Sequence, residues 1–223
     1  MEVVAVLKAR ALMMIELDAL SNGGKVRMSD CIRPLVEKFD FQIFPTKPED
    51  FDFTDKGVGF GSGKAGGMLI DLLKIYDAAF FLDTLSSTSD SKRILLELME
   101  WGRTELGISY EESLIRRWGY ISHIVFKSEI PLLGMYSSPL RKLAAKTSAV
   151  TEQIFEGLQY QPSQIWVGHD PGVRKNAIAS FMIAHRVNTA FSENIFFSEA
   201  PLPTDLHIKF LNEFEKDVME SNT

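Results

Sequence analysis

Apolar residues recur at helical spacing near the start of the chain, and they predict a helix over residues 3–20. The positions that carry this spacing are Val4, Leu7, Ala11, Met14 and Ile15. Asn22-Gly23-Gly24 supplies a helix stop. A second helix is expected from Ser29, a capping residue, to about Phe39, with Pro34 as an interruption. Residues 1–40 are therefore a candidate helical subdomain.

Three further stretches predict longer helices. Capping residues at 86–90 open a helix over 89–106 that ends at Gly107. Ser138-Pro139 opens a helix over 139–158, because proline is favoured at the first helical position. Its apolar positions are Leu140, Leu143, Ala144, Val150, Ile154 and Leu158. The last helix, over 204–219 and capped by Thr204, has a predicted buried stripe of Leu206, Phe210, Phe214 and Val218.

Strand patterns occur in adjacent pairs between these helices. Residues 68–84 favour a hairpin that turns at Asp77-Ala78 over a single helix, and 116–130 reads as a strand or hairpin rich in aromatic and β-branched residues. Two more strands are expected over 164–168 and 177–185. Paired strands favour an α+β fold, with a mostly antiparallel or mixed sheet packed against three to five helices. We expect one compact domain over residues 1–223.

A glycine-rich stretch interrupts the regular pattern between residues 41 and 67, which is expected to be loop, with one short strand as the alternative. It matches G-x-G-x-x-G literally at residues 61–66, but the preceding residues lack the apolar strand that a dinucleotide site requires. A flexible turn or mobile loop is therefore the favoured interpretation. If the loop instead closes over a ligand, the residues concerned are Gly59, Gly61, Gly63, Lys64, Gly66 and Gly67.

Composition and charge restrict the expected cellular location and the expected classes of partner. The net charge is -6 and the pI about 5.3, which makes a nucleic-acid partner unlikely because such proteins usually carry a basic excess or face. Cys31 is the only cysteine, so an intrachain disulfide is excluded and a reducing cytoplasm is the expected location. The sequence shows neither a secretory signal nor a run of apolar residues long enough to span a membrane.

Candidate catalytic residues are few. The four histidines are isolated, and none has the spacing that lets two imidazoles face one metal, so no metal or cofactor is predicted. His169 and Asp170 form the best acid–base pair, since a carboxylate can fix a histidine tautomer. Adjacent residues of an extended chain point to opposite faces, however, so Asp170 is better explained as the start of an Asp-Pro-Gly turn.

Two segments are candidates for a partner-binding surface. Arg141, Lys142 and Lys146 lie in the first half of a predicted helix, where cations oppose the helix dipole. An acidic partner surface or phosphates would account for their placement, but a solvated polar face is the favoured explanation. The second candidate is the apolar segment 191–203, with Phe191, Phe196 and Phe197, which is expected to be core or otherwise a docking surface.

Three functions are consistent with these patterns. Every enzyme motif fails in its context, so we expect a non-catalytic interaction or assembly subunit with a protein partner or a second copy of itself. The alternative is an enzyme acting on a phosphorylated small molecule, with the glycine-rich loop as a lid and His169 or Asp170 as acid–base. A further alternative is a helix-turn-helix regulator built on the N-terminal helix pair.

Overall fold

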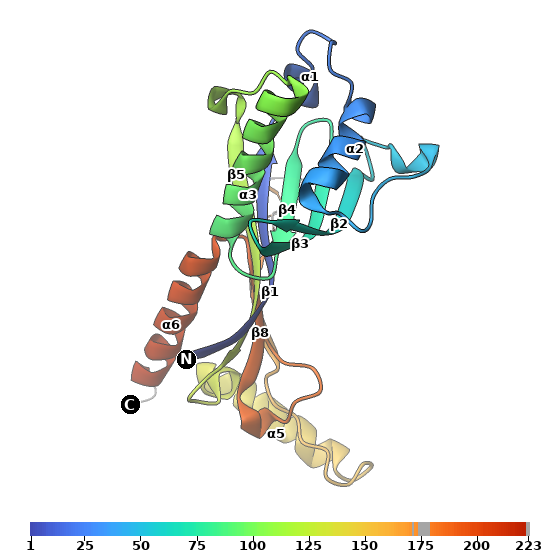
Figure 1. Cartoon of the computed structure of the whole chain (residues 1–223). Helices are drawn as coiled ribbons and strands as arrows, with labels where there is room; N and C mark the ends of the chain where they lie inside the picture. The colour runs from blue at the N-terminus through green and yellow to red at the C-terminus, as the bar shows by residue number, and fades with distance from the viewer. Residues whose placement is uncertain (171, 174–178, 222–223) are drawn as a thin grey trace. The chain divides into compact units, whose positions relative to one another are not determined.

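The computed structural model describes residues 1–170, 172–173 and 179–221 (Figure 1). The strands of these residues form one antiparallel sheet in the order β2-β3-β4-β1-β5-β8-β7-β6, and with the helices they confirm the α+β prediction. The strands are β1 (Glu2–Met14), β2 (Val58–Ala65), β3 (Met68–Ile75), β4 (Phe80–Thr84), β5 (Arg117–Lys127), β6 (Gln164–Val167), β7 (Phe181–His185) and β8 (Ile195–Ala200). The α-helices are α1 (Leu17–Leu20), α2 (Met28–Phe39), α3 (Thr88–Trp101), α4 (Leu132–Tyr136), α5 (Ser138–Thr151) and α6 (Thr204–Glu220).

The chain divides into two compact units. The larger unit contains residues 8–122 and 202–204, and the smaller unit contains 1–7, 123–201 and 205–223. Each unit has its own apolar core. The expectation of one domain over residues 1–223 stays a prediction.

β1 replaces the helix expected over residues 3–20 as far as Met14, and residues 8–14 of this strand belong to the larger unit. Ala9, Ala11 and Met13 are fully buried, while the residues between them are partly exposed. This period of two is typical of a strand with one face on the core. The helical subdomain is therefore wrong for residues 2–14, and only the second of its two helices, α2, is confirmed. The helix-turn-helix alternative loses the first helix on which it depended.

The glycine-rich stretch is also a strand rather than a loop. β2 pairs antiparallel with β3 from Val58 to Ala65, and only Gly66 and Gly67, at φ +52° and +83°, form the turn between them. Gly63 has no room for a side chain, because a Cβ there would overlap the Phe41 ring and lie 3.0 Å from the Phe39 carbonyl oxygen. The glycines of β2 thus allow close packing, and the expected mobile lid is wrong for residues 58–65.

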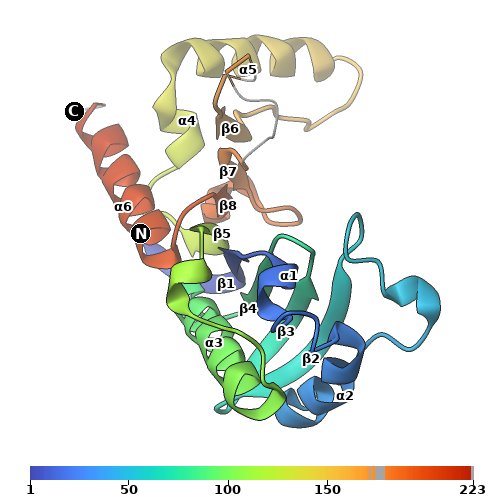
Figure 2. The same ribbon diagram turned by 90° about the horizontal axis from the view of Figure 1, so that it is seen from above.

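The rest of the larger unit follows the predicted pattern. The hairpin expected over 68–84 is present as β3 and β4. Helix α3 is capped as predicted, with the Ser87 hydroxyl accepting the Asp90 amide at 3.0 Å, and the helical turns that follow it end at Gly107, φ +72°. α2 and α3 lie along one face of these strands (Figure 2), where their apolar residues join the core.

The smaller unit packs α6 against its end of the sheet. Ile124, Phe126, Ile183 and Phe196 form the core with two α6 residues, Leu211 and Val218. The predicted stripe of α6 is confirmed in part: Val218 is buried in this core and Phe214 packs against it, whereas Phe210 is exposed. His207, Leu211 and Glu215 are also buried, and two of these three side chains are polar, so apolar spacing alone did not predict them.

The helix expected over 139–158 is shorter and packs differently from the prediction. α5 ends at Thr151, and the following turns lead to Gly157 at φ +78°. None of the α5 residues is buried. The sheet is therefore not packed against this helix through the apolar stripe, which is instead exposed to solvent.

Candidate partner-binding surface

Helix α5 presents two different faces. Figure 2 shows α4 leading into α5, after which the chain returns to β6. Ala144, Ala145, Ser148 and Ala149 line a cleft on the side of α5 that faces this returning chain. At 100° per residue, Leu140, Leu143, Thr147 and Val150 lie on the opposite face. Small side chains therefore face the rest of the unit, and large apolar ones face solvent.

The solvent face of α5 is unusually apolar for an exposed helix. The exposed fraction is 40% for Leu140, 62% for Leu143 and 63% for Val150. Ile154, in the turn after the helix, continues the stripe at 72% exposed. Single exposed apolar residues are ordinary, but a contiguous row on one helix marks an interaction surface.

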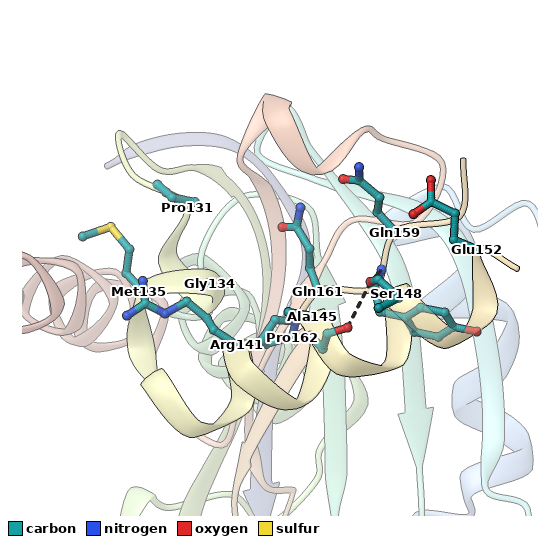
Figure 3. A pocket seen from close by; sticks show the side chains of 13 residues that line it. Pro131, Gly134, Met135, Arg141, Ala145, Ser148, Glu152, Gln159, Gln161 and Pro162 are labelled. Carbon is teal, nitrogen blue, oxygen red and sulfur yellow. Dashed lines mark hydrogen bonds between the residues drawn. The ribbon is translucent and has the colours of Figure 1, made fainter. Parts of the chain in front are cut away.

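The cleft behind α5 has a volume of about 640 Å³. Figure 3 shows Arg141 beside Met135 at one end and Glu152 beside Gln159 at the other. The Ser148 hydroxyl accepts the Tyr160 amide at 2.8 Å and donates to the Ala144 carbonyl at 3.0 Å, which ties the returning chain to the helix. One side chain therefore connects the two walls of the cleft.

The three cations of the sequence prediction lie on this helix as expected. Arg141, Lys142 and Lys146 are exposed, and none forms an ion pair with any residue that the structure describes. α5 contains no aspartate or glutamate. The helix therefore carries three positive charges that no carboxylate of its own neutralises. Arg141 and Lys142 lie near the dipole end that disfavours cations, whereas Lys146 lies past the middle of the helix.

The second predicted surface is largely core. Phe196 is buried and stacks on Phe126 with ring centroids 5.5 Å apart, so it is not available to a partner. Phe197 is half-buried, 5.5 Å from the His123 ring, and Phe191 lies 4.4 Å from the His185 ring. We correct the docking prediction for Phe196, which the smaller unit uses for its own packing, while for Phe191 and Phe197 it stays a prediction.

The candidate acid–base pair has the geometry of a turn. The Asp170 carboxylate accepts the Gly172 amide at 2.8 Å, and the His169 Nδ1 lies 3.2 Å from the Asp170 backbone oxygen, not from its carboxylate. Both side chains are exposed. The glycine segment 57–67 belongs to the larger unit and this pair to the smaller one, so neither unit contains both halves of the predicted enzyme site.

A serine–histidine contact escaped the sequence analysis. Ser198 Oγ on β8 lies 2.8 Å from His207 Nε2 on α6, and both residues are fully buried. The Ser198 hydroxyl donates to the Met182 carbonyl at 2.7 Å, so its only proton is committed and His207 Nε2 is the donor. Burial, and then the charge of His123, lower the pKa of His207 to about 4. The pair is a structural bond and not an activated nucleophile.

Neither a metal site nor a similarity to known proteins indicates a function. Residues 1–170, 172–173 and 179–221 contain no group of three or more His, Cys, Asp or Glu side chains placed to hold a metal. Within the same residues, no helix has the length and apolar character needed to cross a membrane. No protein-family model matches the chain, and no curated protein is significantly similar to it.

Proposed function

We propose that this protein is a non-catalytic interaction or assembly subunit that binds a protein partner through the solvent face of α5. The observation that carries the proposal is that α5 buries none of its residues although Leu140, Leu143 and Val150 form a row along it. Burying an exposed leucine or valine stabilises a complex by about 1.5–3 kcal/mol. A partner that covers this row thus gains substantially from doing so.

The smaller unit has a second exposed apolar feature, at the edge of its sheet. β6 is the last strand of the sheet and pairs only with β7, and its Trp166 and Val167 are exposed. Exposed edge strands with apolar side chains are sites where other chains dock. Tryptophan is among the residues that contribute most to binding at interfaces. This edge supports a protein partner.

The enzyme alternative has weaker support. Its lid would require the β2 glycines to move, but β2 is paired with β3 along its length. Its acid–base pair, His169 and Asp170, is engaged in a local turn. We also propose a cytoplasmic location, because Cys31 is a buried thiol whose pKa is raised by burial and then by Asp30, which suits a reducing compartment.

Affinity purification from the source cell tests the function directly. We expect a partner to co-elute at fixed stoichiometry with the wild-type chain and to be lost from the double variant Leu143→Glu/Val150→Glu, because two carboxylates would have to be buried in the interface. Val187→Glu is the matched control, since Val187 is 79% exposed in the same unit but lies outside α5.

Two results would contradict the proposal. One is that the wild-type chain elutes without any stoichiometric partner, whether another protein or a second copy. The other is that the double variant and the Val187→Glu control retain the partner equally. Circular dichroism of both variants verifies that the fold is intact before binding is compared.

A further inference from the structure

The charges beside the apolar row narrow the chemistry of the partner. We infer that α5 is the docking site for an acidic amphipathic α-helix of a partner protein, an inference that rests on the proposed function. The helix would lay its apolar face along Leu140, Leu143, Thr147 and Val150 and its carboxylates against Lys142 and Lys146.

The spacing of the row fits a helix. Leu140, Leu143, Thr147 and Val150 follow one another at intervals of three, four and three residues, which is the a/d pattern of helices that pack side by side. The row covers about 15 Å of α5 at 1.5 Å per residue. An extended strand would present side chains to this row at a period of two and would match the pattern poorly.

The cations border the row on one side. At 100° per residue, Lys146 projects from the flank next to the apolar face, Lys142 lies one turn before it and further round the helix, and Arg141 projects toward the cleft. In paired helices, the positions that flank the seam select the partner by charge. Because α5 has no carboxylate, the complementary charges must come from the other helix.

A second copy of α5 is a less suitable partner for this surface than an acidic helix. When two identical helices pack antiparallel, the same flank of each meets across the seam, so lysines would face lysines. An anionic membrane is also disfavoured, because the face opposite the row carries small residues against the cleft and the whole chain has a net charge of -6. These occupants are separate outcomes of the test.

Two designed peptides test the charge preference. Both contain three heptads with leucine at a and d, and they differ only in having glutamate or lysine at e and g. Fluorescence anisotropy should show that the full-length protein binds the glutamate peptide at least about tenfold more tightly than the lysine peptide, with the difference shrinking at high salt.

Charge reversal on α5 provides the matched comparison. Lys142→Glu/Lys146→Glu should weaken binding of the glutamate peptide by about tenfold or more and strengthen binding of the lysine peptide. Lys209→Glu/Lys216→Glu makes the same change in net charge on the exposed side of α6 and should leave both affinities within about twofold.

The outcomes separate this inference from the proposed function. The inference is overturned if the glutamate peptide does not bind, if both peptides bind equally, or if reversal on α5 and on α6 have the same effect. Wild-type dimers in sedimentation that Leu143→Glu/Val150→Glu dissociates would assign α5 to a second copy. Binding to phosphatidylserine vesicles that Lys142→Glu/Lys146→Glu abolishes would assign it to a membrane.

Co-elution of the natural partner distinguishes failure of the acidic-helix inference from failure of the proposed function. If its co-elution is lost in Leu143→Glu/Val150→Glu but unaffected by Lys142→Glu/Lys146→Glu, the acidic-helix inference fails and the proposed function stands. If neither double variant affects the partner, both fail.

Discussion

The Ser148 hydroxyl accepts the backbone amide of Tyr160 at 2.8 Å, twelve residues further along the chain. The same hydroxyl donates to the Ala144 carbonyl within α5, so one side chain links the helix to the segment that returns to β6. This link closes the turn around Gly157 and leaves the apolar row of α5 on the outer side. The position of the proposed docking surface therefore depends on a polar contact at its back.

Removal of this hydroxyl should loosen the returning segment without unfolding the protein. Ser148→Ala leaves the Tyr160 amide without its acceptor, and we expect faster hydrogen exchange at Tyr160 with a loss of about 0.5–1.5 kcal/mol of local stability. Thr147→Val is the control, because the Thr147 hydroxyl bonds only within the helix, to the Leu143 carbonyl at 3.0 Å. Equal exchange at Tyr160 in the two variants would show that Ser148 does not hold the segment.

Glu215 is predicted to make the smaller unit sensitive to acid. Its carboxylate accepts the Ser128 hydroxyl at 2.5 Å and pairs with the Met1 ammonium at 2.7 Å. Burial alone raises the pKa of Glu215, but these contacts and the Glu129 amide outweigh burial and hold the pKa below the ordinary 4.5. The stabilisation is therefore present above pH 4.5 and is lost as the pH falls through the lower pKa of the folded state.

Glu215→Gln tests that contribution. We expect unfolding in urea to require about 3 kcal/mol less at neutral pH, because the buried ammonium loses its counterion, and the acid-dependent loss near and below pH 4.5 to be reduced. Glu213→Gln, an exposed neighbour on the same helix, is the control. An unchanged pH dependence in Glu215→Gln would contradict the assigned role.

The sequence predicts those elements of the fold that are determined by interactions between residues close together in the chain. The Ser87 cap of α3 and the hairpin over 68–84 are visible because capping and alternation act within a few residues. The prediction for residues 3–20 is wrong because the apolar residues of this stretch fit both helical spacing and the two-residue alternation of Ala9, Ala11 and Met13. Pairing with β4 makes the stretch a strand. Tertiary pairing of this kind has no local signal.

The candidate surface was predicted in part for the same reason. Arg141 and Lys142 lie near the helix end where cations are unfavourable, and the sequence alone indicates this local anomaly. The exposure of Leu143 and Val150 was not predictable, because their spacing is the same whether the facing element belongs to this chain or to a partner. The Ser198–His207 contact joins β8 to α6, and no sequence pattern predicts this contact either.

The glycines of β2 should differ sharply in their tolerance of a side chain. Gly63→Ala places a methyl group against the Phe41 ring, and we expect a loss of about 1–3 kcal/mol in urea unfolding. In Gly59→Ala the nearest atom is the Lys74 Cε at 3.7 Å, an ordinary contact, so the change should stay within about 0.5 kcal/mol. A mobile glycine loop would instead tolerate both substitutions equally.

His207 should stay neutral in the folded protein throughout the physiological range. Burial first, and then the charge of His123, lower the pKa of His207 from 6.5 to about 4. Between pH 4 and pH 6.5, His207 is protonated in the unfolded chain but stays neutral in the folded one. Stability is therefore full above pH 6.5 and declines toward pH 4, by about 3 kcal/mol in all.

The measurement for His207 is an NMR titration of its ring. We expect the chemical shifts of the His207 ring to remain constant down to about pH 5. A midpoint near 6.5 for His207 would contradict its burial and reopen the possibility that it exchanges protons with Ser198.

Site-specific photocrosslinking in the source cell tests the central claim most directly. A benzophenone side chain at position 150 lies in the apolar row of α5, and one at position 187 lies outside α5 in the same unit, where the native valine is 79% exposed against 63% at position 150. We predict a single crosslinked adduct of defined mass from position 150 and none of that mass from position 187. Absence of an adduct at 150, or the same adducts at both positions, would contradict a partner-binding role for α5.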